Sequence, residues 1–193
     1  GVTSKPENWR RRTIIRDTWG GGCQDMGTVS CDLVFVLGAV ESLEWRRVVQ
    51  TESATNGDIL WVQDNPEGKR SNFSRKVGAF FSYALHLQSP HAPGFVLRTD
   101  DDMFVNLKRL FAERSGLNAP LYWGNRMFAI AVDRLAAHRI GEDSYGCEVW
   151  PPFLSGGALV LSRDILKILL VNRPVTLRAQ SLDDVAIAMQ LAN

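Results

Sequence analysis

The chain has 193 residues, of which 45% are hydrophobic and 22% are charged, and its formal net charge is +1 at pH 7. This length and composition are typical of one ordinary globular domain with a sizeable core, and a charge so near zero excludes a global electrostatic attraction to nucleic acid or to a membrane surface. No stretch approaches the roughly 20 consecutive apolar residues that span a bilayer. The three cysteines are too few for a dense disulfide framework, although Cys23 and Cys31 are close enough in sequence to bridge across a short loop.

The first predicted helix covers residues 6–19 and carries a dense basic cluster. Asn8 is a candidate N-cap for this helix. The cluster consists of Arg10, Arg11, Arg12 and Arg16. A solvated helix face is the plain interpretation of such a cluster, and an anion site is the alternative. Three glycines at residues 20–22 end the helix.

Between residues 33 and 105, apolar runs of strand type alternate with segments of helical periodicity. Strands are predicted at 33–37, at 58–62 and from Phe95 onward, and helices at 41–52 and from Ser74 onward. The second of these helices has an apolar stripe formed by Val77, Phe80, Phe81, Ala84 and Leu85. The polar segment 64–71 is predicted to be a loop. The alternation indicates right-handed crossovers and a mostly parallel sheet with helices on both faces.

The last part of the chain has a more mixed pattern. Two further strands are predicted at 121–124 and 158–161, and two further helices follow the capping candidates Ser162 and Ser181. No internal repeat, low-complexity segment or linker divides the chain. The sequence therefore predicts a single domain over residues 1–193.

Three consecutive carboxylates, Asp100, Asp101 and Asp102, follow the apolar run that begins at Phe95. Adjacent like charges repel one another, and ligands of open α/β sheets bind at the carboxyl ends of the strands. Oxygen ligands suit Mg²⁺ or Mn²⁺, so the triplet predicts a cation site. A solvated acidic turn is one alternative. A structural calcium loop is another, but residues 100–106 lack the spaced acidic residues that such a loop needs.

The segment Arg98–Asn106 resembles the metal-binding aspartate motif of glycosyltransferase family 31, the inverting β-1,3-galactosyltransferases, β-1,3-N-acetylglucosaminyltransferases and Fringe-type enzymes. Four further segments are similar to motifs of this family and follow in the family's order: 11–19, 58–64 with 72–76, 150–162 and 182–185. Any one of these motifs alone is a weak signal. Together they span almost the whole chain.

This resemblance implies a GT-A-type fold, which is a Rossmann-like mixed α/β sheet flanked by helices. It implies a hexosyltransferase that moves galactose or N-acetylglucosamine from a UDP-sugar to a sugar hydroxyl in β-1,3 linkage, with inversion. The acceptor would be a glycan on a glycoprotein or glycolipid, and nucleic acid would not be a partner. The resemblance also implies the catalytic domain of a type II membrane protein in the Golgi lumen, whose membrane segment would lie outside this chain.

The resemblance also assigns roles on the donor side. Asp102 would bind Mn²⁺ or Mg²⁺ directly, Asp100 would contribute to the metal site, and either Asp100 or Asp101 would face the ribose of the nucleotide. Donor-binding roles fall to Arg12, Arg16, Asp64 and Lys76, together with Asp100 and Asp101. For Arg12, Arg16 and Lys76, a surface ion pair is the alternative to contact with phosphate.

On the acceptor side, Asp184 falls in the family's Glu-Asp-Val motif and would be the general base. Its alternative is a capping box, because Ser181 and Asp184 have the spacing of that motif. Trp150 and Phe153 would stack on a sugar or belong to the core, and these two interpretations stay open. Gly156 and Gly157 would form a loop at the donor or acceptor site, or a tight turn into the next strand.

Two departures from the family pattern lead us to expect a chain truncated at both ends. The family has a strand before its arginine motif, where this chain begins with residues 1–4, and a histidine metal ligand downstream of the position of Asp184, where this chain has none. A catalytically inactive module that binds UDP-sugar or glycan is the alternative function. A phosphate-handling enzyme on a flavodoxin-like sheet is a third hypothesis, but the sequence lacks the Gly-rich phosphate loop that it requires.

Overall fold

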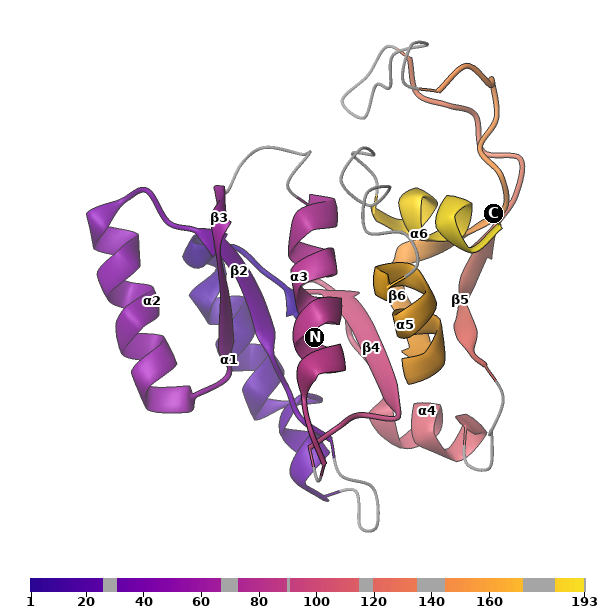
Figure 1. Cartoon of the computed structure of the whole chain (residues 1–193). Coiled ribbons are helices and arrows are strands. Elements are labelled where there is room, and N and C mark those ends of the chain that lie inside the picture. The colour runs from indigo at the N-terminus through magenta and orange to yellow at the C-terminus, as the bar shows by residue number, and fades with distance from the viewer. Residues whose placement is uncertain are drawn as a thin grey trace.

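A six-stranded mixed sheet runs through the middle of the molecule, and helices lie on both of its faces (Figure 1). The computed structural model describes residues 1–25, 31–66, 73–89, 91–114, 120–134, 145–171 and 183–192. The strands lie in the order β3 (Ile59–Pro66), β2 (Phe35–Ala39), β1 (Val2–Thr3), β4 (Phe95–Asp100), β6 (Phe153–Ser162) and β5 (Tyr122–Met127). The predicted α/β fold with a mixed sheet of GT-A-like type is confirmed.

Strand direction divides the sheet into two parts. The strands β3, β2, β1 and β4 are parallel, whereas β6 runs antiparallel to both of its neighbours, β4 and β5. Within the parallel part, Thr3 of β1 pairs with Asp100 of β4. The carboxyl ends of these two strands therefore lie side by side at one edge of the sheet, where ligands bind in folds of this kind.

The short strand β1 corrects one expectation. We expected the strand before the arginine motif to be missing, but Val2 and Thr3 form it in the middle of the sheet. The backbone N–H of Val2 donates to the Val34 carbonyl at 2.8 Å, and the N–H of Thr99 donates to the Gly1 carbonyl at 3.0 Å. Both neighbouring strands bond to these two residues.

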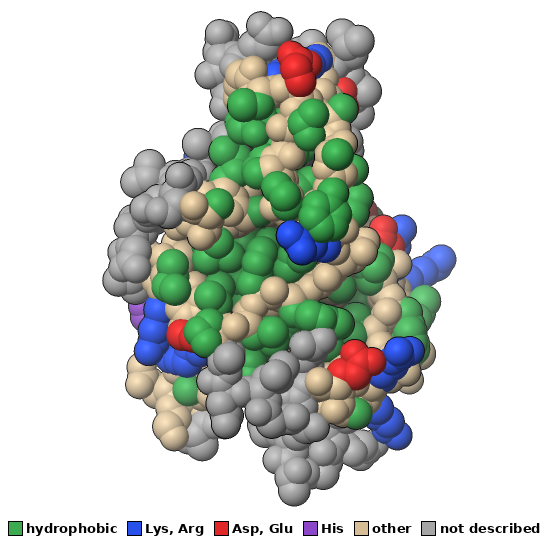
Figure 2. Space-filling model, turned by 90° about the vertical axis from the view of Figure 1, so that its right-hand side faces the viewer, with side chains coloured by type: hydrophobic (Ala, Val, Ile, Leu, Met, Phe, Trp, Pro, Cys, Tyr) green, Lys and Arg blue, Asp and Glu red, His purple; other side chains and the backbone are tan. Residues whose placement is uncertain are grey.

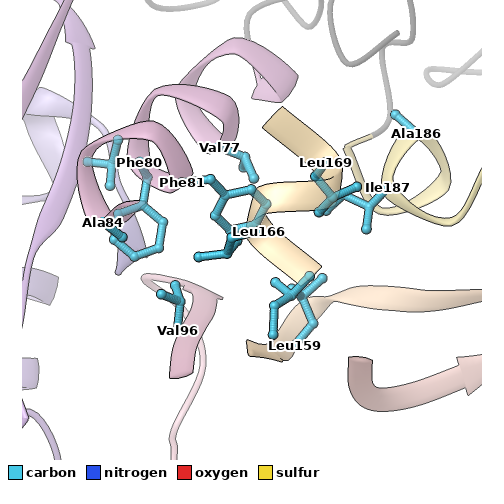
Figure 3. Packing of buried hydrophobic residues seen from close by; sticks show 12 residues of the cluster. Val77, Phe80, Phe81, Ala84, Val96, Leu159, Leu166, Leu169, Ala186 and Ile187 are labelled. Carbon is cyan, nitrogen blue, oxygen red and sulfur yellow. The ribbon is translucent and has the colours of Figure 1, made fainter. Parts of the chain in front are cut away.

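Three helices cover one face of the sheet: α3 (Phe73–His86), α5 (Arg163–Val171) and α6 (Asp183–Ala192). Figure 3 shows Phe81 of α3 beside Leu166 of α5, above Val96 and Leu159 of the sheet. The predicted apolar stripe of α3 is confirmed, since four of its members are buried: Val77, Phe80, Phe81 and Ala84.

The opposite face is covered mainly by α1 (Trp9–Asp17), which follows the short 3-10 helix η1 (Pro6–Asn8). Ile15 of α1 packs there with Phe35 and Leu37 of β2 and with Val49 of α2 (Leu43–Asn56). Successive strand residues point to opposite faces, so Val36, between Phe35 and Leu37, belongs to the core under α3. This confirms that β2 is buried on both faces.

Several boundaries differ from prediction. The strand β3 continues through Pro66 into the predicted loop, because it regains pairing with Ala39 after a register shift. The acidic strand ends at Asp100, and Phe104 beyond it is exposed and lies outside any strand. The helix α4 (Leu107–Arg114) was not predicted. Gly156 and Gly157 lie inside β6 and not in a loop or turn, because β6 extends five residues before the predicted Ala158.

The connection between β5 and β6 projects from the body of the molecule (Figure 1). In its described parts, residues 128–134 and 145–152, the two stretches pair through a bridge between Ala131 and Val149. Its base has a separate apolar cluster, formed by Val132, Trp150, Phe153, Val185 and Ala188. Figure 2 shows hydrophobic side chains along this side of the molecule, up into the projecting part.

The three cysteines form one disulfide and leave one free thiol. A disulfide joins Cys23 to Cys31, as the spacing allowed, and Cys147 is exposed with a free thiol. Among the described helices, none has both the length and the apolar character needed to cross a membrane.

Candidate active site

A pocket of about 340 Å³ opens at the edge where β1 and β4 end. Its lining comes from the end of β1, from η1 and α1, and from the acidic triplet: Thr3, Ser4, Lys5, Glu7, Asn8, Arg11, Asp100, Asp101 and Asp102. The parallel pairing of β1 with β4 explains this composition, because it brings residues 3–4 and 100–102 to the same edge although they are far apart in sequence. The structure thus brings together the whole predicted triplet and the start of the basic helix.

The carboxylate of Asp100 is bound by side chains of both paired strands, Thr3 of β1 and Arg98 of β4. The hydroxyl of Thr3 donates to Oδ1 of Asp100 at 2.5 Å. Arg98, whose side chain is only 2% exposed, forms an ion pair with the same carboxylate, with Nη2 at 3.1 Å from Oδ1. These contacts fix the orientation of Asp100, while 34% of its side-chain surface stays exposed.

Asp101 accepts three hydrogen bonds from side chains of the first eleven residues. Ser4 Oγ donates to Oδ2 at 2.7 Å, Asn8 Nδ2 donates to Oδ2 at 2.8 Å, and Arg11 Nη1 donates to Oδ1 at 2.9 Å. Asn8 occupies the predicted N-cap position of α1, but its side chain makes no capping bond and is used for Asp101 instead. Asp101 therefore ties the start of α1 to the end of β4.

Asp102 differs from both neighbours because it is exposed, and no hydrogen bond reaches its carboxylate from the described residues. The described residues contain no group of three or more His, Cys, Asp or Glu side chains that would form a complete metal cage. Mg²⁺-type sites at phosphates need fewer ligands, since one or two carboxylates act together with the phosphates and water. The oxygen donors of Asp102 and Asp100 fit a site of that type.

Arg12 has no contact with this pocket, because its guanidinium is buried behind it. The side chain is fully buried, and its five N–H donors all have acceptors in the protein. Nε and Nη2 donate to the two carboxylate oxygens of Glu52, at 2.8 and 2.6 Å. The other donors reach Ser4 Oγ and the carbonyls of Lys5 and Pro6. In this arrangement Arg12 retains no donor for a phosphate.

Arg16 is also used inside the fold. Its Nε and Nη2 form a bidentate pair with Asp58 at 2.7 and 2.8 Å, and its Nη1 lies 2.8 Å from Oε1 of Glu52. Burial alone would lower the pKa of Arg16, but Asp58 and Glu52 raise it above its ordinary value. Arg12 and Arg16 therefore form an ion-pair network with Glu52 inside the fold, and not the surface ion pair that was the alternative to phosphate contact.

The arginine that lines the pocket is Arg11, which the sequence analysis did not single out. Its side chain is half exposed, and the hydrogen bond and charge of Asp101 raise its pKa, with a smaller contribution from Asp102. One sequence signal was available for it. Arg11 follows Asn8 by three positions, so the two side chains share a helix face, and both reach Asp101.

Lys76 and Asp64 were the other donor-site candidates. Lys76 is 2% exposed at the start of α3, and its Nζ donates to the carbonyl of Ser4 at 2.8 Å. Lys76 therefore does not line the pocket, but it binds the backbone of Ser4, which does. The side chain of Asp64 lies outside the part of the chain that is described.

Asp184 lies in the first turn of α6, and its carboxylate faces the middle of β6. The backbone N–H of Gly156 donates to Oδ2 at 3.1 Å, and the N–H of Val185 donates to Oδ1 at 2.8 Å. Ser181, the partner in the alternative capping box, lies outside the described residues. Asp184 is thus a helix-terminal carboxylate whose orientation is set by a strand.

Gly156 is where Asp184 and the buried guanidinium of Arg98 approach each other. A Cβ atom at this position would lie 3.1 Å from Nη1 of Arg98 and 3.4 Å from Oδ2 of Asp184. The missing side chain therefore leaves room for both groups at one point of β6. Because Arg98 also pairs with Asp100, a single buried guanidinium lies between Asp100 and Asp184.

Trp150, Phe153 and Gly157, the remaining predicted site residues, contribute to packing and to the sheet. Trp150 is 5% exposed and stacks on Tyr145 with ring centroids 4.5 Å apart, and Phe153 is 8% exposed in the same apolar cluster. Both aromatic residues belong to the core, which was one of the two open interpretations. Gly157 accepts a hydrogen bond from the hydroxyl of Thr99 at 2.7 Å through its carbonyl, which fixes β6 beside the end of β4.

Comparison with known proteins gives a consistent result. The chain is 30% identical over 169 residues to beta-1,3-galactosyltransferase bre-5 of Caenorhabditis elegans, covering 86% of this chain and 51% of that protein. It is 29% identical to human beta-1,3-galactosyltransferase 9, covering 88% of this chain and 46% of that protein. It is 27% identical to human lactosylceramide 1,3-N-acetyl-beta-D-glucosaminyltransferase, covering 85% of this chain and 45% of that protein.

The chain thus spans about half the length of these relatives. The sequence profile of the galactosyltransferase family matches residues 10–193, which include the basic helix, the acidic triplet and Asp184. The resemblance drawn from the five motifs is confirmed. From both comparisons it follows that this chain belongs to the galactosyltransferase family.

Proposed function

We propose that the intact protein transfers galactose or N-acetylglucosamine from a UDP-sugar to a sugar hydroxyl, in β-1,3 linkage and with inversion at the anomeric carbon. The observation that carries this proposal is the pocket at the ends of β1 and β4, which is lined by Asp100, Asp101, Asp102 and Arg11 in a chain of the galactosyltransferase family. The names of the relatives support the linkage and the two sugars, since they are a β-1,3-galactosyltransferase and a 1,3-N-acetylglucosaminyltransferase.

On the donor side, the leaving group is a diphosphate, whose negative charge has to be neutralised. Asp102, with Asp100 beside it, would hold the Mn²⁺ or Mg²⁺ ion, which supplies a Lewis acid for the diphosphate oxygens. Arg11 lies at the mouth of the same pocket with about half of its side chain exposed, so its remaining N–H groups are placed to bind an anion. Arg11 takes the phosphate-binding role that the sequence gave to Arg12 and Arg16.

On the acceptor side, Asp184 is the proposed general base. The acceptor hydroxyl oxygen forms a bond to the anomeric carbon while the bond from that carbon to the diphosphate oxygen breaks, and the electron pair leaves with the diphosphate. The hydroxyl proton passes to the carboxylate of Asp184. The hydrogen bond from Gly156 N–H orients Oδ2 of this carboxylate, and attack from the face opposite the leaving group inverts the configuration.

The proposed acceptor is a glycan on a glycoprotein or glycolipid, and the proposed location is the Golgi lumen, as the catalytic domain of a type II membrane protein. One relative is named a lactosylceramide 1,3-N-acetyl-beta-D-glucosaminyltransferase, and because lactosylceramide is a glycolipid, this name supports the acceptor class. The disulfide between Cys23 and Cys31 supports an oxidising compartment of the secretory pathway.

A transfer assay on the intact protein tests the proposal. UDP-galactose and UDP-N-acetylglucosamine are offered with β-linked sugar acceptors, with Mn²⁺ and with a chelator, and the linkage of the product is determined by NMR. Asp184→Asn should lower kcat by about 100-fold or more, the loss typical of a general base. Asp183→Asn is the matched control, because it removes the same charge from the same end of α6.

The second candidate is a catalytically inactive module that binds UDP-sugar or glycan. It would bind its ligand in the same pocket at the ends of β1 and β4. Binding of UDP without release of UDP from any sugar donor, in the presence of Mn²⁺ and acceptor, would decide for this alternative. Unchanged turnover in Asp184→Asn would instead remove Asp184 from the catalytic role.

A further inference from the structure

Ser4 is the residue on which the buried polar groups behind the pocket converge. It follows β1 directly, is 3% exposed, and makes a hydrogen bond with every polar atom that it has. Its N–H donates to the Val36 carbonyl at 3.1 Å, and its carbonyl accepts from Nζ of Lys76 at 2.8 Å. Its Oγ accepts from Nη1 of Arg12 at 3.0 Å. Two buried cations, from α1 and α3, thus bind one serine.

The hydroxyl of Ser4 has one hydrogen to donate, and the structure indicates where it goes. Oδ2 of Asp101 lies 2.7 Å from Oγ, whereas the nearest alternative acceptor, the Lys5 carbonyl, lies 3.4 Å away. A hydrogen bond to a carboxylate is also stronger than one to a neutral carbonyl. Because Arg12 donates to the same oxygen, it polarises the hydroxyl and strengthens its bond to Asp101.

Arg12 is itself held by a partner outside the pocket. Glu52 of α2 accepts from Nε and Nη2 of Arg12, with 11% of the Glu52 side chain exposed. A continuous line of hydrogen bonds therefore runs from Glu52 through Arg12 and Ser4 to Asp101. Asp101 in turn binds Asn8 and Arg11 at the pocket wall.

We propose that Ser4 is a positioning residue for the donor site, and that Arg12 and Lys76 act on that site through Ser4. Ser4 fixes the carboxylate of Asp101, which in turn fixes Arg11 at the pocket mouth and leaves Asp102 directed to the ligand side. This inference rests on the proposed function, since it takes the pocket to be the site of the UDP-sugar. It assigns Ser4, which was given no role in the sequence analysis, to the machinery of that site.

The test measures the affinity of the intact protein for UDP by calorimetry in the presence of Mn²⁺. Ser4→Ala should weaken UDP binding about tenfold, the effect of one hydrogen bond to a charged group. Ser4→Thr retains the hydroxyl and should bind UDP within about threefold of the unaltered protein. Ser162→Ala is the control, because Ser162 is a similarly buried serine that binds Leu121 N and Asp164 far from the pocket.

A double-mutant cycle distinguishes positioning from a general loss of stability. If Ser4 acts through Asp101, Ser4→Ala should have almost no further effect on UDP affinity in a protein that already carries Asp101→Ala. Should Asp101→Ala bind UDP too weakly to measure, the comparison of Ser4→Thr with Ser4→Ala decides the question. The measured unfolding midpoint of each variant shows how much of any effect follows stability.

Three results would overturn the inference: unchanged UDP affinity in Ser4→Ala, equal losses in Ser4→Ala and Ser4→Thr, or an equal loss in Ser162→Ala. Failure of the proposed function looks different, because the unaltered protein itself would then not bind UDP with or without Mn²⁺. The UDP affinity of the unaltered protein therefore distinguishes failure of the proposed function from failure of the inference about Ser4.

Discussion

The backbone N–H of Gly156 donates a hydrogen bond to Oδ2 of Asp184 at 3.1 Å, so a strand in the middle of the sheet holds a carboxylate of the last described helix. The two residues are 28 positions apart in sequence. The absence of a side chain at Gly156 allows this approach, and it also leaves room for the guanidinium of Arg98. The relationship places the proposed base beside the residue that holds Asp100.

Gly156→Ala should therefore disturb the reaction more than the fold. The added Cβ would lie 3.1 Å from Arg98 Nη1, which has to shift by a few tenths of an ångström, and it would come into direct contact with Asp184 Oδ2 at 3.4 Å. A misplaced catalytic group lowers kcat by about 10- to 100-fold. Gly157→Ala is the matched control in the same strand, because its Cβ would meet only flexible side-chain ends, at Met103 and Ser155. Equal kcat values in the two variants would contradict this prediction.

Asp101 and Asp102 should respond differently to the same substitution. Asp102→Asn should lower transfer and Mn²⁺-dependent UDP affinity by about 100-fold, since it weakens a metal ligand, while the thermal unfolding midpoint stays unchanged. Asp101→Asn should lower the midpoint as well, because Asp101 accepts hydrogen bonds from Ser4, Asn8 and Arg11. Thermal unfolding and transfer rates of both variants check this. If the unfolding midpoint fell in Asp102→Asn but not in Asp101→Asn, the structural role would belong to Asp102 and not to Asp101.

Glu52 should make stability depend on pH in the acid range. Burial acts to raise the pKa of Glu52, but the hydrogen bonds and charges of Arg12 and Arg16 lower it by more, so its pKa lies below the ordinary value. A lowered pKa stabilises the folded state above the unfolded-state pKa of about 4.3, and this stabilisation is lost as the pH falls through the folded-state pKa. Glu52→Gln should therefore cost about 3 kcal/mol at pH 7.

The same difference should begin to shrink as the pH falls below the unfolded-state pKa of about 4.3, and it should disappear below the lowered folded-state pKa, where Glu52 is protonated in both states. Denaturant unfolding of both proteins between about pH 3 and pH 7 measures it. Glu113→Gln is the control, since Glu113 forms an exposed pair with Arg109 on α4 and should change stability little at any of these pH values. A stability difference for Glu52→Gln that does not vary with pH would argue against the ion-pair network.

The disulfide should stabilise the segment that follows α1. Cys31→Ser opens the bridge between positions 23 and 31, and the loss of a cross-link over a short loop costs about 2 to 3 kcal/mol. Cys147→Ser in both proteins prevents exchange with the exposed free thiol. Thermal unfolding with and without reductant gives the difference. If reductant still lowered the unfolding midpoint of the Cys31→Ser protein, the lower midpoint would not be due to the Cys23–Cys31 disulfide.

Much of the fold could be predicted from local sequence. The apolar runs of β2 and β4, the stripe Val77–Ala84 of α3 and the glycines after α1 are periodic or positional signals that act over a few residues. The wrong boundaries lie where a partner strand extends an element. Pro66 belongs to β3 because Ala39 pairs with it, and the start of β6 lies before Ala158 because Phe153 and Leu154 pair with Met127 and Arg126 of β5.

For the site, the sequence by itself determined the family and the position of Asp100, Asp101 and Asp102 at the end of a strand, because both follow from contiguous residues. It did not determine which arginine faces the pocket. Arg11 and Arg12 are neighbours in sequence but about 100° apart around the helix, so they point to different surroundings.

Only the tertiary structure decided between these two arginines. Glu52, 40 positions away in sequence, binds the guanidinium of Arg12 in the interior. Asp101, 90 positions away from Arg11, binds the guanidinium of Arg11 at the pocket. The same holds for Ser4 with Asp101 and for Gly156 with Asp184. These pairs form because the sheet brings distant strand ends together, and no local pattern in the sequence encodes which ends become neighbours.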